Sequence, residues 1–165
     1  RRWHARRIEV LADTEADFLL AETIPNVDEA AVLLELLSAQ PKPFALSTTG
    51  AIAADAAKLS QVIALAHQAP RRGGVGVNCV SPSQALAVVK AVRAGTDKSL
   101  LACPNSGEIW DHGAGDWRPA PAGAMGLTEA AATMRAAGVS LLGGCCRVGP
   151  AEIRQLRRSV RFEGE

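Results

Sequence analysis

Short apolar runs alternate with amphipathic stretches along this chain. The first apolar run, DFLLAE at residues 17–22, precedes the stretch VDEAAVLLELLSA at residues 27–39. Apolar residues recur in that stretch at the spacing of one helix face: Ala30, Leu33, Leu34 and Leu37. Asn26, followed three residues later by Glu29, is typical of a helix N-terminus. The pattern therefore predicts a strand, a loop and a helix, which Pro41 would end.

The same strand–helix unit recurs along the rest of the chain. Further apolar runs predict strands at residues 44–48, 74–79, 99–103 and 139–144. Amphipathic stretches and cap residues predict helices at residues 55–67, from Ser81 to near Gly95, at residues 128–137 and after Pro150. Residues 104–117 are rich in glycine, and we expect a long loop there.

Five apolar strands that alternate with helices indicate an α/β fold of parallel βα units, with both faces of the sheet covered. We expect residues 1–165 to belong to one domain, with no linker or second domain. In such folds the side chains that carry chemistry gather at the carboxyl ends of the strands. Polar and thiol residues follow the predicted strands here: Glu22, Ser47, Thr48, Asn78, Cys79, Cys103, Asn105, Cys145 and Cys146. The pattern predicts a site on this rim of the sheet.

The charge balance and the lengths of the apolar runs argue against two classes of partner, nucleic acids and membranes. Eighteen Lys and Arg residues oppose seventeen Asp and Glu residues, and a net charge of +1 argues against nucleic acid as the main partner. No apolar run reaches the roughly 18 residues that span a bilayer, and the start RRWHARR lacks the apolar core of a signal peptide. We therefore expect no membrane partner and a cytoplasmic location. Because Arg1 is not an initiator methionine, we expect a processed chain or a piece of a longer one.

The four cysteines are the main candidates for chemistry. Thiols stay reduced in the cytoplasm, so four of them in 165 residues favour metal binding or catalysis over disulfides. Cys145 and Cys146 can chelate one metal where the backbone turns sharply. The preceding Gly143 and Gly144 permit such a path, and Cys79 could supply a third ligand. Cysteine is also a common buried hydrophobe, so the spacing alone leaves a metal site and a structural role both open.

Four segments together resemble one known family. The chain contains, in this order, AETIPNVDEA, GVGVNC, CPNSGEIWD and LLGGCCRVGPAEI, and in these segments it closely resembles the homocysteine S-methyltransferase family. The resemblance implies a (β/α)8 barrel of the TIM type. Residues 1–165 would form its C-terminal part, an incomplete barrel of about five parallel βα units that corresponds to strands four to eight.

The resemblance also implies a site and a reaction. It identifies Cys79, Cys145 and Cys146 as zinc ligands. It identifies Glu22 as the group that holds the homocysteine amino group, and Asn105 as a loop residue that lines the pocket. The implied reaction moves a methyl group from a sulfonium donor, of the S-methylmethionine or S-adenosylmethionine type, to the homocysteine thiolate and gives methionine. No catalytic side chain is required, because zinc makes the substrate sulfur a thiolate.

Alternative functions of the chain and of its cysteines remain open. The chain could be a non-catalytic zinc- or thiol-binding partial barrel that needs an N-terminal partner, or Cys145 and Cys146 could form a redox switch. Without the resemblance, we expect Glu22 to be a carboxylate that pairs with a neighbouring helix, and Cys103 to be a buried thiol. We assign no role to the three histidines, and we expect Trp110 and Trp117 to pin the long loop.

The chain departs from the family in two segments and in extent. RVGP at residues 147–150 stands where relatives commonly carry hydroxyl side chains, and STTGAIAADAAKL at residues 47–59 lacks a longer loop. Five strands of an eight-strand barrel cannot close, and open edges invite pairing. We therefore expect self-association or complementation by an N-terminal half.

Overall fold

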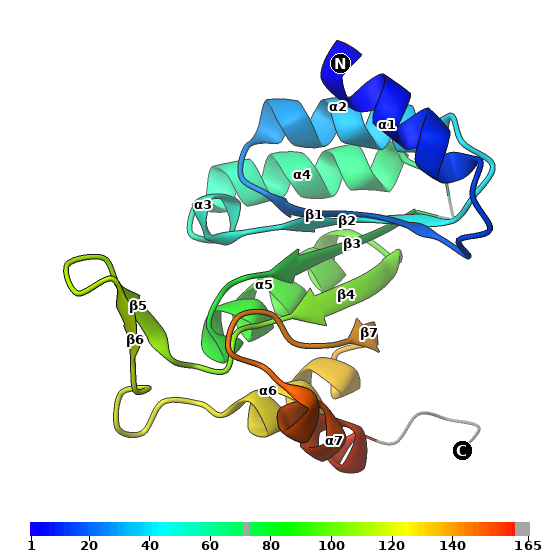
Figure 1. The fold of residues 1–165 in the computed structure, drawn as a ribbon. Coiled ribbons are helices and arrows are strands. Elements are labelled where there is room, and N and C mark those ends of the chain that lie inside the picture. The colour runs from blue at the N-terminus through cyan, green and yellow to red at the C-terminus, as the bar shows by residue number, and fades with distance from the viewer. Residues whose placement is uncertain (71–72, 161–165) are drawn as a thin grey trace.

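A five-stranded sheet lies at the centre of the computed structural model, which describes residues 1–70 and 73–160 (Figure 1). The strands are β1 (Leu19–Ile24), β2 (Phe44–Thr48), β3 (Gly73–Asn78), β4 (Ser99–Cys103) and β7 (Val139–Leu142). They lie in this order across the sheet, and every neighbouring pair is parallel. The predicted α/β fold of five parallel βα units is confirmed.

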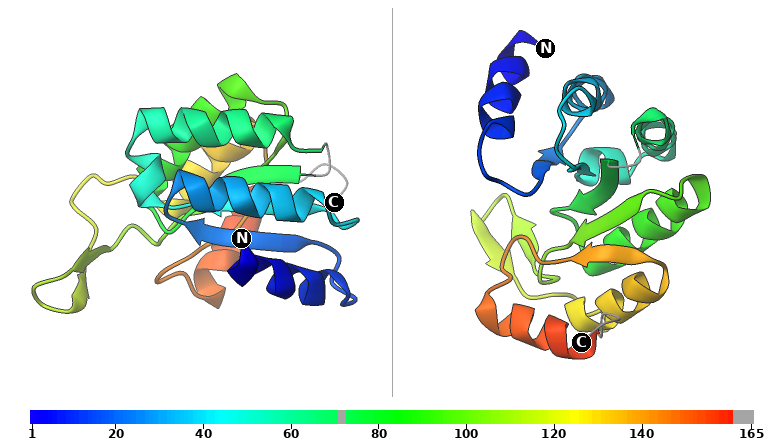
Figure 2. Two further views of the ribbon diagram at one scale, coloured as in Figure 1. Left: turned by 90° about the horizontal axis from the view of Figure 1, so that it is seen from above. Right: turned by 90° about the vertical axis from the view of Figure 1, so that its right-hand side faces the viewer.

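Helices follow the strands and pack along the outside of the curved sheet. They are α1 (Arg2–Ala12), α2 (Val27–Ser38), α3 (Gly50–Ala53), α4 (Ala56–Gln68), α5 (Pro82–Gly95), α6 (Leu127–Ala136) and α7 (Pro150–Ser159). Viewed from the side in the right panel of Figure 2, they form an arc around the strands. The prediction that both faces are covered is met on the outer face and is wrong for the inner face, because a sheet curved as in a barrel turns that face away from its helices. Leu20, on the side of β1 away from the helices, is exposed.

Local sequence signals explain why the helices begin where they do. Asn26 accepts a hydrogen bond from the backbone N–H of Glu29 and caps α2. Ser81 and Gln84 form a capping box at the start of α5, with Pro82 as its first residue. The apolar stripe predicted for α2 is buried in the core: Ala30, Leu33, Leu34 and Leu37. These helices are held to the sheet by the apolar faces that the sequence predicts.

The structure differs from the sequence-based prediction in a few elements. The predicted loop at residues 104–117 contains an antiparallel hairpin of β5 (Ile109–Asp111) and β6 (Asp116–Arg118), in which Trp110 packs edge-on against Trp117. The short helix α3 was not predicted. β1 extends two residues beyond its predicted end, so Glu22 lies within the strand, and β7 ends before Gly143. No helix in the described ranges combines the length and apolar character needed to cross a bilayer.

Gly76 lies in β3 at a point where β4 approaches closely. A Cβ at this position would overlap the backbone carbonyl of Leu101, which cannot move aside as the end of a flexible side chain could. We expect Gly76→Ala to lower the free energy of unfolding by about 3 kcal/mol, at the upper end of overpacking effects. Gly50→Ala is the matched control, because its Cβ would meet Val80 Cγ1 at 3.8 Å. Chemical denaturation compares the two, and equal stabilities would contradict this packing.

Candidate metal centre

Three thiols meet at the carboxyl-end rim of the sheet. Cys79 directly follows β3, and Cys145 and Cys146 lie in the turn after β7. Their sulfur atoms all lie within 4.8 Å of one another, and the Sγ atoms of Cys79 and Cys146 are 3.5 Å apart. Sulfur atoms that share a tetrahedral zinc ion at about 2.3 Å lie about 3.8 Å apart. The three thiols therefore fit one metal ion with small side-chain movements.

The segment after β4 holds the cysteine pair in place through its backbone. The N–H of Cys145 donates to the carbonyl of Pro104 at 2.8 Å, and the N–H of Ser106 donates to the carbonyl of Cys146 at 3.1 Å. Asn105 lies beside the pair, where its Oδ1 accepts from the N–H of Cys146 at 3.0 Å. The structure thus brings Asn105 to the thiols as a support of the Cys146 backbone.

Two glycines allow the turn to approach its neighbours closely. A Cβ on Gly143 would lie 2.9 Å from the Cys103 sulfur at the end of β4. A Cβ on Gly144 would overlap the side chain of Val148. Cys79 itself has a φ of 59°, a left-handed backbone that is uncommon for a residue with a side chain. The chain therefore accepts local constraints on both sides of the thiol cluster, as functional sites often do.

Burial favours the protonated form of two thiols on the rim, Cys79 and Cys103. It raises the pKa of Cys79 to about 12, and hydrogen bonds with Cys146 and Cys145 add to the rise. Burial also raises the pKa of Cys103 to about 11, with a further contribution from the negative charge of Glu22. A metal that binds the cluster must displace protons, so its affinity increases with pH.

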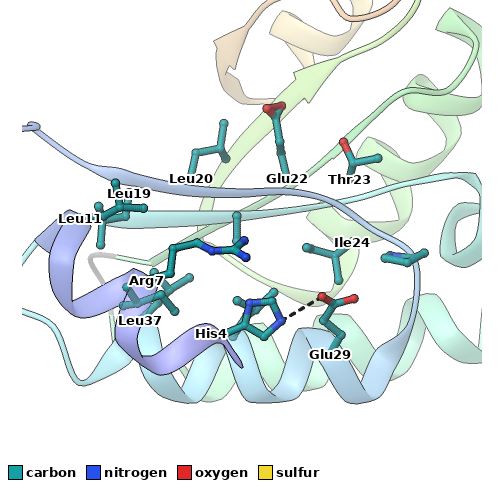
Figure 3. Close-up of a pocket in the computed structure, with 14 residues that line it drawn as sticks. His4, Arg7, Leu11, Leu19, Leu20, Glu22, Thr23, Ile24, Glu29 and Leu37 are labelled. Atoms are coloured by element: carbon teal, nitrogen blue, oxygen red, sulfur yellow. Dashed lines mark hydrogen bonds and ion pairs between the residues drawn. The ribbon is translucent and has the colours of Figure 1, made fainter. Parts of the chain in front are cut away.

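Glu22 lies outside the thiol cluster, on β1 at the edge of the sheet. Figure 3 shows its carboxylate on the side of β1 that faces away from α1 and α2. A cavity of about 390 Å³ lies between these helices and β1, and His4 Nε2 contacts Glu29 Oε1 across it at 3.0 Å. Glu22 borders this cavity but points to the opposite side of the strand, whereas no cysteine lines it. The cavity is therefore separate from the thiol rim.

Arg147 gives the unusual RVGP segment a structural role. Its Nε donates to Glu108 Oε2 at 2.8 Å, which lowers the pKa of that carboxyl group. Ser106 also donates to Glu108 through its hydroxyl at 3.2 Å. This ion pair ties the cysteine turn to the segment after β4.

Comparison with known proteins relates the chain to one family. A family model described as homocysteine S-methyltransferase matches residues 1–160. Homocysteine S-methyltransferase 4 of Zea mays is 36% identical over an alignment of 169 positions, and the alignment covers 98% of this chain and 49% of that protein. Homocysteine S-methyltransferase of Escherichia coli (strain K12) is 34% identical over 94% of this chain and 51% of its own length. The chain spans about half the length of the curated relatives it matches.

The fold also matches solved structures. The metallated form of the homocysteine methyltransferase MmuM from Escherichia coli superposes with a TM-score of 0.72 at 31% identity, covering 95% of this chain and 50% of that one. The apo form gives a TM-score of 0.73 and covers 96% and 55%. These matches confirm the resemblance and agree with an incomplete barrel.

Single cysteine substitutions distinguish the cysteines that bind the metal from those that do not, through their effect on zinc affinity. We expect Cys145→Ser to weaken zinc binding by about 100-fold or more, because it removes one of three sulfur ligands. Cys103→Ser is the matched control, since its thiol lies on the same rim outside the three-sulfur cluster, and it should leave the affinity nearly unchanged. Competition with a chromophoric chelator on the reduced chain measures both values. Equal losses for the two variants would contradict the ligand assignment.

Proposed function

This chain belongs to the homocysteine S-methyltransferase family, and we propose that it carries the metal-binding part of a site that methylates homocysteine. The proposed reaction moves a methyl group from a sulfonium donor to the homocysteine thiolate and gives methionine. The observation that carries the proposal is the cluster of three thiols on the rim, with all sulfur atoms within 4.8 Å of one another. We place the reaction in the cytoplasm, where such thiols stay reduced.

Zinc is the metal that this donor set suits best. Three soft sulfur ligands favour zinc among the common divalent ions, and a catalytic zinc site keeps a fourth position open. When bound there, zinc would supply the positive charge that keeps a substrate thiol ionised at neutral pH. Cys79, Cys145 and Cys146 are the proposed ligands, and Asn105 supports them by holding the backbone N–H of Cys146.

Glu22 is the proposed partner of the homocysteine amino group. It is exposed on the side of β1 away from the helices. Its negative charge contributes to the raised pKa of Cys103 on the thiol rim. An ammonium group held there would orient the substrate with its sulfur toward the cysteines. The thiolate electron pair then forms a bond to the donor methyl carbon. The bond from that carbon to the donor sulfur breaks, and its electron pair neutralises the sulfonium, so no redox partner is needed.

We propose that the active site is completed by barrel strands beyond the five described here. β1 and β7 are the outer strands of the sheet, and each pairs with one neighbour within the described residues. An eight-strand barrel must close to bury its edges. A second copy or a separate N-terminal half could supply the partner strands. The family match supports methyl transfer over the alternative of a non-catalytic zinc-binding partial barrel.

Fragment complementation tests this function directly. We expect the chain to form methionine from homocysteine and S-methylmethionine when it is mixed with the N-terminal half of the Zea mays relative. Cys146→Ser should abolish this turnover. Tight zinc binding without turnover, alone or with any N-terminal partner, would instead support the non-catalytic alternative.

The role of Glu22 is tested by a pair of ligands that differ in one group. Glu22→Gln should weaken binding of homocysteine to the cobalt-loaded chain by about tenfold, because a hydrogen bond to a charged group is lost. Binding of 4-mercaptobutyrate, which lacks the amino group, should not change. Glu129→Gln, in the first turn of α6, is the control. Displacement of the cobalt absorption bands reports binding, and equal losses for both thiols would exclude an amine contact.

A further inference from the structure

Asn78 joins three parts of the rim through one buried side chain. It is the last residue of β3 and is 1% exposed. Its Oδ1 accepts hydrogen bonds from the backbone N–H of Thr23 at 3.0 Å and from the hydroxyl of Ser47 at 2.8 Å. Its Nδ2 donates to the hydroxyl of Thr23 at 2.7 Å and to Cys145 Sγ at 3.9 Å. A single amide therefore contacts β1, β2 and the turn after β7.

These contacts determine which way the amide points. A backbone N–H can only donate, so the atom of Asn78 that faces the Thr23 nitrogen must be the oxygen. Nδ2 must then face the hydroxyl of Thr23 and the sulfur of Cys145, both of which can accept. The direction of the contact with Cys145 thus follows from the contact with Thr23.

The segment that Asn78 holds on β1 has an unusual backbone. Thr23 has a φ of 62°, which is rare for a β-branched residue, and the register of β1 with β2 shifts between Ala21 and Ile24. Consecutive side chains of a regular strand point to opposite faces. Figure 3 shows Glu22 and Thr23 on the same side of β1. Asn78 binds both the N–H and the hydroxyl of Thr23. It therefore stabilises the backbone conformation in which Glu22 and Thr23 lie on the same side of β1.

We propose that Asn78 is a positioning residue that fixes the sulfur of Cys145 relative to Glu22, an inference that rests on the proposed function. Its amide donates to the proposed metal ligand and holds the segment that carries the proposed amine ligand. Groups that hydrogen-bond to metal ligands orient them, and their removal commonly weakens metal binding by about 10- to 100-fold. Asn78 is not one of the proposed ligands of the metal or the substrate, and its proposed action runs through its contacts with Cys145 and Thr23.

Three variants of similar buried positions test this role. Asn78→Leu keeps the branched shape and removes every polar atom. Ser47→Ala removes one hydrogen bond to Oδ1 and leaves Nδ2 facing Cys145. Thr48→Val is the matched control, because Thr48 is equally buried in the neighbouring strand and its hydroxyl donates to the carbonyl of Gly76.

Zinc affinity, cobalt absorption and melting temperature are measured on the reduced chain for each variant. We expect Asn78→Leu to weaken zinc binding by about tenfold or more and to shift the sulfur-to-cobalt absorption band. Ser47→Ala should weaken binding less, and Thr48→Val should leave affinity and spectrum unchanged even where its melting temperature falls. If a folded Asn78→Leu chain matches Thr48→Val in both readouts, the proposal is overturned.

A metal-free measurement keeps the test decisive if Asn78→Leu does not fold. In the zinc-free wild-type chain, nuclear Overhauser effects should connect the Nδ2 protons of Asn78 with the β-protons of Cys145, and Ser47→Ala should retain them. Their absence would overturn the role of Asn78 even where zinc binds. Zinc binding by the wild-type chain no tighter than by Cys145→Ser would contradict the proposed function, while the amide contact would still be decided by the metal-free experiment.

Discussion

The three thiols meet because the turn after β7 crosses the end of β4. Cys79 follows β3, and β4 lies between β3 and β7 in the sheet. The turn that carries Cys145 and Cys146 must therefore pass over the end of β4 to reach Cys79. Gly143 allows this passage, since its backbone donates to Ala102 and any Cβ would press on the sulfur of Cys103. Pro104 and Ser106 then fasten the pair by backbone hydrogen bonds. The geometry of the site therefore depends on close backbone contact at one point of the rim.

The position of the turn over β4 also affects the pKa of Cys79 and the ion pairing beside the thiols. Partial burial raises the pKa of Cys79, so this thiol holds its proton until a cation compensates for the negative charge. The neighbouring ion pair of Arg147 with Glu108 lies outside the cluster and closes the turn. Arg147 and Glu108 thus neutralise each other beside the thiols. This arrangement suits the proposed role of the centre, which is to hold a substrate sulfur in its ionised form.

Local signals in the sequence predict the elements of this fold, and long-range contacts account for what they miss. Asn26 and Ser81 mark helix starts through bonds to residues three positions away, so the pattern is visible in the sequence. The left-handed backbone of Thr23 depends on Asn78, 55 residues further along the chain, and no local pattern reports it. The hairpin of β5 and β6 escaped prediction because its strands have three residues each. Spacing suggested the thiol cluster but left buried structural thiols as an open alternative, and the family resemblance decided between them.

X-ray absorption at the zinc edge of the reduced, zinc-loaded chain shows whether the three cysteines bind one metal ion together. A centre built from Cys79, Cys145 and Cys146 predicts three sulfur atoms at about 2.3 Å and one lighter donor atom. The sulfur shell should fall to two atoms in Cys145→Ser and stay at three in Cys103→Ser. A first shell made only of nitrogen and oxygen, or one with fewer than three sulfur atoms in the wild-type chain, would contradict a three-cysteine metal centre.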